Sequence, residues 1–153
     1  TDDDLPKEAR AKFKKGYPQD NIIFSDDRTA VLIPAGVPLS PTSFLEALKA
    51  RRVFATADKR SQIIFRAGEH LMGERFKHQG PLELEVEYSS TAGAAIKRLD
   101  IVRGRVGGKV EVIGHEASVT VTPEPGTWFY YARIVQEDGA KLWSAPVWVE
   151  VAP

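Results

Sequence analysis

The segment from Trp128 to Val151 constrains the fold more than any other part of the sequence, because it reads as two strands around one turn. In its first half, Tyr130, Ala132 and Ile134 take every second position. Side chains at this spacing point to one side of a strand, so we expect these three to face a core.

The second half of the segment carries the matching pattern of a return strand. Asp138 and Gly139 suit a chain reversal, since aspartate bonds nearby backbone and glycine accepts positive φ. Val147, Val149 and Val151 then alternate with polar or aromatic residues. The sequence therefore predicts a β-hairpin.

A period of two also governs the chain from Ser61 onward. The expected strands lie near residues 62–67, 82–88, 96–102, 109–113 and 118–122, followed by the two strands of the hairpin. About seven short strands at a spacing of ~8–12 residues are typical of an immunoglobulin- or fibronectin-III-like β-sandwich. In such folds Tyr130 or Tyr131 would stand where a corner tyrosine bonds backbone upstream. The predicted fold class is thus mostly β, with the sandwich preceded by a small α/β segment.

That N-terminal segment, residues 1–57, is expected to hold two short helices, and the sandwich domain is expected to span residues 58–153. One helix is predicted at about 5–15. The second is predicted at about 41–52, because Ser40 can cap it and Pro41 suits its first position. Its expected packing face consists of Phe44, Leu45 and Leu48. Short buried strands are predicted at 21–24 and 29–33.

Composition narrows the function classes. Lys plus Arg and Asp plus Glu both number 21, and this zero net charge disfavours a general nucleic-acid binder. No run approaches the ~18 apolar residues of a membrane span. Cysteine is absent, which excludes disulfides and thiolate metal sites. The chain starts at Thr1 rather than Met, so either a leader was removed or the chain is a piece of something longer.

No catalytic or metal-ligating constellation is visible in the sequence. The histidines are His70, His78 and His115, all in predicted turns, and no H-x-H or H-E-x-x-H occurs. Three carboxylates alternate along one predicted strand, at Glu83, Glu85 and Glu87, but they would need ligands from elsewhere to hold a cation, which favours a solvated face. We therefore expect no catalytic residue, no metal site and no cofactor in this chain.

Three tryptophans, Trp128, Trp143 and Trp148, fall in or beside the hairpin and are the candidate binding residues. Aromatic platforms on a sandwich stack on sugars, so a carbohydrate- or protein-binding module is one hypothesis. The alternative is that they close the ends of the core or face a neighbouring domain, which we favour.

Two segments resemble one enzyme family. The first runs from Phe44 through the Ala50–Thr56 stretch and is followed by Met72–Phe76; the second is Phe129–Gly139 continuing to Trp143–Val149. Together they resemble the C-terminal part of bacterial metal-dependent phosphoesterases of the polymerase-and-histidinol-phosphatase (PHP) superfamily. The likeness runs from about Arg28 to Val151. It implies the tail of a metal-binding α/β barrel over residues 28–56 and a β-sandwich over 61–151.

The family's metal ligands have no counterpart in this chain. The early His-x-His ligands are missing, and so is the late Asp-x-His pair expected upstream of Arg28. The resemblance thus implies a non-catalytic accessory domain whose partner is the catalytic barrel of the parent enzyme, which uses divalent metals. Another hypothesis is half of a metallophosphoesterase completed by a second chain. The resemblance also implies a secreted or periplasmic protein.

Overall fold

A computed structural model describes residues 27–153, which form one helix and twelve strands. The predicted helix at 5–15 and the predicted strand at 21–24 lie outside the described residues. The elements, in chain order, are β1 (Arg28–Val31), α2 (Pro41–Lys49), β2 (Val53–Thr56), β3 (Ser61–Ala67), β4 (His70–Leu71), β5 (Arg75–Lys77), β6 (Leu82–Ser90), β7 (Ile96–Arg105), β8 (Val110–Gly114), β9 (Ser118–Val121), β10 (Gly126–Gln136), β11 (Lys141–Ser144) and β12 (Val147–Val151).

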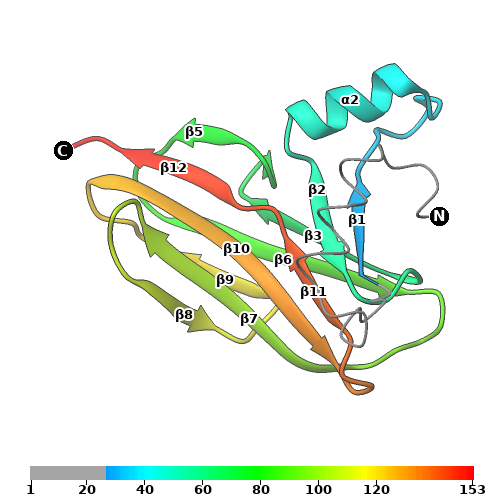
Figure 1. The fold of residues 1–153 in the computed structure, drawn as a ribbon. Helices are drawn as coiled ribbons and strands as arrows, with labels where there is room; N and C mark the ends of the chain where they lie inside the picture. The colour runs from blue at the N-terminus through cyan, green and yellow to red at the C-terminus, as the bar shows by residue number, and fades with distance from the viewer. Residues whose placement is uncertain (1–26) are drawn as a thin grey trace, which may run out of the picture.

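The described residues are mostly β and form two sheets. The large sheet has the order β1-β2-β11-β10-β12-β5, with β7 on the other edge of β10 and β8 beside β7. The small sheet has the order β4-β3-β6-β9. All pairings are antiparallel except β12 with β5, which is parallel. In Figure 1 the strands β3 and β6 of the small sheet pass behind β10 and β12 of the large one.

The predicted hairpin is confirmed. β10 pairs with β11 through Arg133↔Trp143, Ile134↔Leu142 and Val135↔Lys141. Gly139 has a φ of +88°, and the Ala140 amide donates to Asp138 Oδ1 at 3.0 Å. The return is broken around Pro146 and resumes as β12, which pairs with the other half of β10 from Gly126↔Val151 to Tyr130↔Val147. The broken return lets β11 pair with β2 while β12 pairs with β5.

The hydrophobic core lies between the two sheets. From the large sheet, Tyr130, Ala132 and Ile134 are fully buried, as their alternation predicts. Leu99 and Ile101 of β7 are also buried and belong to the same sheet. The small sheet contributes alternating residues of its two long strands to the opposite side of the core: Ile63, Phe65, Ala67, Leu82, Leu84 and Val86. Burial of these apolar surfaces is what holds the two layers together.

The expected corner tyrosine is wrong. Neither Tyr130 nor Tyr131 bonds a backbone group upstream, and the fully buried Tyr130 side chain interacts with Arg103 instead. A different tyrosine closes a turn: the Tyr88 hydroxyl donates to the Ala94 carbonyl at 2.7 Å. Tyr88 lies near the end of β6, a position that pattern alone does not distinguish from those near other strand ends.

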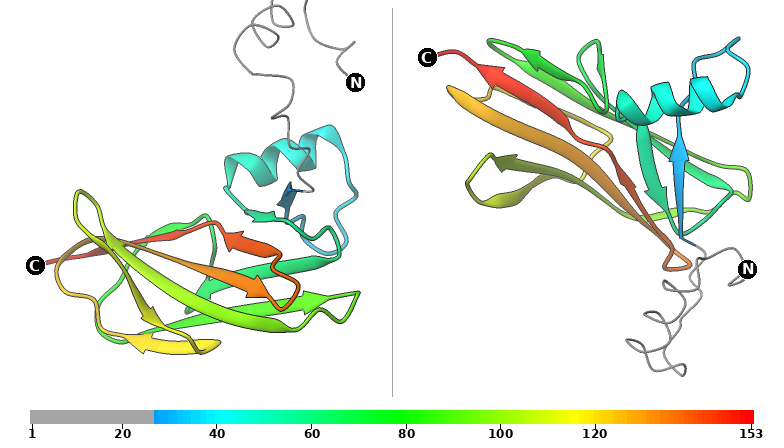
Figure 2. Two further views of the ribbon diagram at one scale, coloured as in Figure 1. Left: turned by 60° about the horizontal axis from the view of Figure 1, so that its bottom comes forward. Right: turned by 45° about the horizontal axis from the view of Figure 1, so that its top comes forward.

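The helix α2 begins as predicted. The Ser43 amide donates to Ser40 Oγ at 3.1 Å, the Ser40 amide donates to Ser43 Oγ at 2.9 Å, and Pro41 opens the first turn. These two bonds form a capping box. In both views of Figure 2, α2 lies beside β1 and β2, away from β7 and β8.

The predicted packing face of α2 is wrong. Ser43 and Ala47 are the buried residues, whereas Phe44, Leu45 and Leu48 are 42%, 52% and 39% exposed. The small side chains of Ser43 and Ala47, four positions apart, let the helix pack closely on the adjacent strands. The bulky apolar residues of the helix then face outward. Sequence pattern assigns the apolar stripe to the core, but here the core lies between the sheets and not under this helix.

The helix also ends earlier than the predicted residue 52. Lys49 is its last residue, and Arg51 has a φ of +56°. The Arg51 side chain reaches the next turn, because its Nε donates to the Gly73 carbonyl at 2.8 Å. Gly73 itself has a φ of +98°, and a Cβ there would overlap the carbonyl oxygens of Ala50 and Arg51. This close approach ties the end of α2 to the turn between β4 and β5.

The predicted strand at 29–33 forms as β1 but is not buried. Arg28 and Thr29 are exposed and Ala30 and Val31 are half-buried, since β1 is the last strand on its side of the large sheet. β1 and β2 fall within the expected N-terminal segment, and through Leu142↔Thr56 they continue the large sheet beyond β11.

Candidate functional site

The three tryptophans do not share one surface. Trp143 pairs with Arg133 and Trp148 pairs with Phe129, so both lie on the outer face of the large sheet, defined here as the face turned away from the small sheet. The two partners, Arg133 and Phe129, are four positions apart on β10, which places them about 13 Å apart. Trp128 pairs with the buried Val149 and therefore belongs to the inner face.

Trp128 and Trp148 are each engaged by two arginines. The guanidinium groups of Arg103 and Arg105 lie 5.0 and 5.6 Å from the ring centroid of Trp128. Those of Arg51 and Arg75 lie 5.4 and 5.8 Å from that of Trp148. Such cation–π contacts occupy the ring faces that a ligand would need.

Trp143 differs from the other two. It is 40% exposed, and it makes no ring stacking or cation–π contact with any residue of 27–153. Of the three predicted binding residues, this one presents an aromatic face to solvent.

The three histidines form no metal-ligand cluster, although His70 and His78 both contact the Phe76 ring. His70 Nδ1 lies 2.7 Å from Glu74 Oε2, and its ring stacks on Phe76 at 3.7 Å. His78 Nε2 lies 2.9 Å from the Pro81 carbonyl oxygen. His115 Nδ1 lies 3.0 Å from the Leu99 carbonyl oxygen. No three potential metal-ligating side chains gather within the described part of the chain.

The predicted acidic face on β6 is exposed, as its alternation indicates. Glu87 accepts a hydrogen bond from Arg66 Nε at 3.2 Å, and Glu83 accepts one from Ser118 Oγ at 3.1 Å. These contacts cross to neighbouring strands of the small sheet, so the carboxylates take part in cross-strand pairs.

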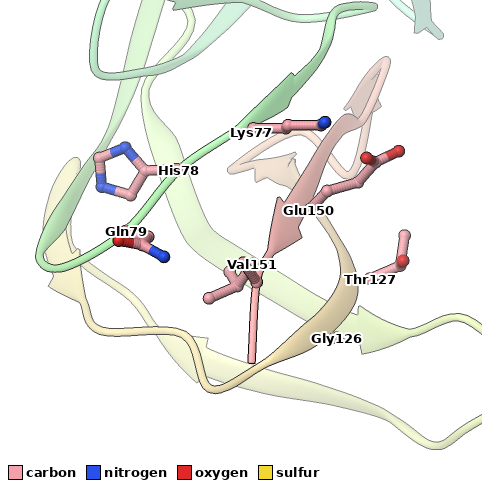
Figure 3. A pocket seen from close by; sticks show the side chains of 8 residues that line it. Lys77, His78, Gln79, Gly126, Thr127, Glu150 and Val151 are labelled. Carbon is pink, nitrogen blue, oxygen red and sulfur yellow. The ribbon is translucent and has the colours of Figure 1, made fainter.

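A hollow of about 530 Å³ lies beside the ends of β5 and β12 (Figure 3). In Figure 3 the side chains of Lys77 and Glu150 point to one side of the strand pair, and His78 points to the other. Among the residues that line this hollow only Thr127 carries a hydroxyl, and no hydrogen bond joins it to His78 or Glu150. Nucleophilic catalysis requires such a bonded pair, so the arrangement gives no basis for that chemistry.

A second hollow, about 170 Å³, lies on the outer face of the large sheet around a buried carboxylate. Asp100 on β7, Arg133 on β10 and Trp143 on β11 are direct cross-strand neighbours and form one row. Arg98, Val135 and Lys141 form the adjacent row. Side chains of paired residues stand on the same face, so the two rows together line the hollow.

Asp100 holds this group together. Its Oδ1 accepts from Arg98 Nε at 2.8 Å, and its Oδ2 accepts from Arg133 Nε at 2.7 Å. His115 Nδ1 lies 2.9 Å from Oδ1. Burial alone would raise the pKa of Asp100, but the bonds and charges of the two guanidinium groups outweigh burial and lower the pKa below 3.8. The carboxylate is therefore ionised at neutral pH.

Sequence reasoning missed this site. Arg98, Asp100 and Arg133 carry no motif, and 33 positions separate Asp100 from Arg133. The alternation of residues 96–102 is a usable signal, because it places Arg98 and Asp100 on the face opposite to Leu99 and Ile101. Their proximity to Arg133 and Trp143 depends on strand register, which the sequence does not state.

A third surface feature is apolar. The outward residues of α2, together with Val37 and Leu39 of the preceding loop, form what we call the α2 apolar patch. Leu39 is 77% exposed, the highest value of any large hydrophobic residue described. Exposed apolar side chains gathered in one place mark interaction surfaces more often than chance.

The comparisons with known proteins identify no family. No family model matches the chain, and no curated protein matches it. Among solved structures, an engineered protein is similar over 60% of this chain, with 13% sequence identity and a TM-score of 0.41. The chain spans 20% of the length of that structure. A likeness at this level carries no argument about fold or function. Within residues 27–153, the structure also has no helix of the length and apolarity that crossing a bilayer requires.

Proposed function

We propose that this chain is a non-catalytic accessory domain that packs on the catalytic barrel of a PHP-type metal-dependent phosphoesterase. The observation that carries the proposal is the α2 apolar patch. Phe44, Leu45 and Leu48 lie on one side of a helix whose buried residues, Ser43 and Ala47, are small. A helix with a bulky apolar side turned to solvent is suited to lie in a groove of a partner.

The resemblance supplies the identity of that partner. In PHP enzymes with this arrangement, a segment like Ala50–Thr56 closes the barrel and leads into the sandwich. In this chain the same residues lead from α2 into β2, which joins the large sheet. The helix would then belong to the barrel's wall, and its apolar side would face the preceding barrel elements. Packing of this kind supports the barrel, and hydrolysis remains the barrel's task.

We also propose that the two sheets form an immunoglobulin-like sandwich. Assigned in chain order, β3, β6 and β9 would be strands A, B and E of one sheet, and β7, β10 and β11–β12 would be C, F and G of the other. β8, next to β7, would correspond to the extra strand that variable-type domains add beside C. The antiparallel pair of β1 and β2, which α2 connects, is an addition to this plan.

The first test is the reading frame upstream of Thr1. A barrel with His-x-His metal ligands is the expected result, and a frame without one overturns the proposal. The second test uses the full-length protein. Hydrogen exchange of the α2 amides is expected to be at least tenfold slower there than in the isolated chain, because docking covers the patch. Equal exchange in both would contradict docking.

A matched pair of variants localises the contact. Leu45→Glu in the full-length protein is expected to restore fast exchange in α2, since a carboxylate would be buried unpaired in the interface. Val110→Glu is the control, because Val110 is equally apolar and exposed but lies on β8, far from the helix in both views of Figure 2. Zinc or manganese retained at one equivalent by the isolated chain would contradict the non-catalytic assignment.

A further inference from the structure

We propose that the hollow between Arg98, Arg133, Lys141 and Trp143 binds an acidic saccharide unit, with the sugar ring on the Trp143 indole and its carboxylate at the guanidinium groups. This site is independent of the accessory role proposed above, because it lies on the outer face of the large sheet and not on α2.

The two arginines are held in place with most of their donors unused. Each uses its Nε for Asp100, and neither donates from an Nη atom to any residue in the described range. A guanidinium has five N–H donors, so four on each arginine remain for a ligand. Asp100 is only 2% exposed, and it fixes both side chains before a ligand arrives. Fixed donors lose little conformational freedom on binding.

The charge of the site favours an anion. Arg98, Arg133 and Lys141 contribute three positive charges and Asp100 one negative charge, which leaves a local charge of +2. The Lys141 ammonium makes no hydrogen bond or ion pair with residues 27–153. Paired guanidinium donors match the two oxygens of a carboxylate, which they can bind in a bidentate manner.

The aromatic wall and the size of the hollow select a sugar ring. Trp143 is 40% exposed and makes no cation–π contact with an arginine of residues 27–153, unlike Trp128 and Trp148. A volume of about 170 Å³ is well below the ~300–1,000 Å³ of sites for drug-sized ligands. One ring fits this space, and the open outer face lets the saccharide chain continue on both sides. The apolar C–H face of the ring would cover the indole while its hydroxyls stay hydrated.

Nucleic acid is the less suitable ligand for the same cations. Backbone binding requires an extended run of positive charge, and this chain has 21 acidic residues against 21 basic ones. The site is one hollow with one exposed aromatic residue, which suits one charged ring and not a continuous phosphate backbone.

The test is a titration of the chain with a uronic-acid tetrasaccharide, in which binding is measured by isothermal titration calorimetry and by tryptophan fluorescence. We expect saturable binding of the acidic tetrasaccharide, and at least tenfold weaker binding of a neutral glucose tetrasaccharide and of a short single-stranded DNA. Absence of binding, or equal binding of the neutral sugar or the DNA, overturns the proposal.

Variants then assign the contact to the hollow. Trp143→Ala is expected to weaken binding about tenfold or more, as the loss of a central aromatic contact does. Lys141→Gln is expected to weaken binding about two- to fivefold and to flatten its salt dependence. Lys97→Gln removes the same charge from an exposed position of β7 outside the hollow and should leave binding unchanged. Thermal melting confirms that each variant folds; unchanged binding by a folded Trp143→Ala variant contradicts the site.

Discussion

Gln136 Nε2 donates a 2.7 Å hydrogen bond to Ser61 Oγ and so joins the end of β10 to the start of β3, across the two sheets. The same nitrogen lies 2.9 Å from the Tyr88 hydroxyl. Ser61 and Tyr88 already donate their own protons, to Asp58 and to the Ala94 carbonyl, so both must accept from Gln136. Gln136 is fully buried, and this polar network fixes how the layers sit at one end of the core.

Replacing Gln136 should therefore destabilise the fold. Gln136→Ala removes the hydrogen bonds that Gln136 donates to the buried Ser61 hydroxyl and the half-buried Tyr88 hydroxyl, and we expect a loss of about 2 kcal/mol in the free energy of unfolding. Urea denaturation measures this loss. Gln62→Ala is the control, because Gln62 is exposed on β3 and should change stability by less than about 0.5 kcal/mol. Equal effects of the two substitutions would contradict the role of the network.

Acid should weaken the same network. The hydroxyl of Ser61 and the amide of Arg60 both donate to Asp58, and these bonds lower its pKa from 3.8 to about 2. Because the folded pKa lies below the unfolded one, the stabilisation from Asp58 is complete above about pH 4 and is lost as the pH falls toward 2.

A pKa lowered from 3.8 to about 2 corresponds to about 2 kcal/mol of stability that the protein loses in acid. Urea denaturation of the chain and of Asp58→Asn across pH 2–6 measures it. The difference in stability between the two proteins should shrink as the pH falls through that window. Glu85→Gln removes an exposed carboxylate of β6 and serves as the charge control. A difference that is constant with pH would contradict the lowered pKa.

The structure and the sequence pattern make opposite predictions for substitutions in α2, because the structure buries Ala47 and exposes Leu45. Leu45→Ala should cost less than about 0.5 kcal/mol in the isolated chain, because Leu45 is 52% exposed. Ala47→Leu should cost about 1–3 kcal/mol, because Ala47 is fully buried and the larger side chain has no space. Thermal or urea denaturation compares them. If Leu45→Ala lost more stability than Ala47→Leu, Leu45 would belong to the packed face of α2 and the exposed assignment would be contradicted.

Gly73 should tolerate no side chain. Gly73→Ala combines an unfavourable positive φ with overlap against the carbonyl oxygens of Ala50 and Arg51, so we expect a loss of about 3 kcal/mol or more. Gly80 has a similar φ of +85° but nothing within 4 Å of a Cβ. Gly80→Ala should therefore cost only about 1 kcal/mol, and denaturation of the two variants separates strain from overlap.

Local pattern identified the elements whose partners are near in sequence or whose burial is strongly periodic. The hairpin around Gly139, the alternation of Leu82–Tyr88 and the Ser40 cap all follow from residue type and spacing. Two predictions were wrong. The packing face of α2 depends on where the core lies, and the position of a turn-closing tyrosine depends on which strand end lies near an available backbone carbonyl.

The candidate saccharide site shows the same division. Trp143 was recognisable as an aromatic residue that can bind, but its distinction from Trp128 and Trp148 required their arginine neighbours. Arg133 and Asp100 became a pair only through the register of β10 on β7. A shift of that register by one residue would have turned Asp100 away from Arg133 and toward the core.

By itself, the sequence determined that this is a mostly β chain without cysteine, with alternating strands and a short capped helix, because burial on one face of a strand leaves a period of two in the residues. Tertiary structure alone decided which distant positions meet: Gln136 with Ser61, Asp100 with Arg133, Gly73 with the end of α2. The physical reason is that propensity and capping act over a few residues. Strand register and layer packing are instead set by the burial of the whole core.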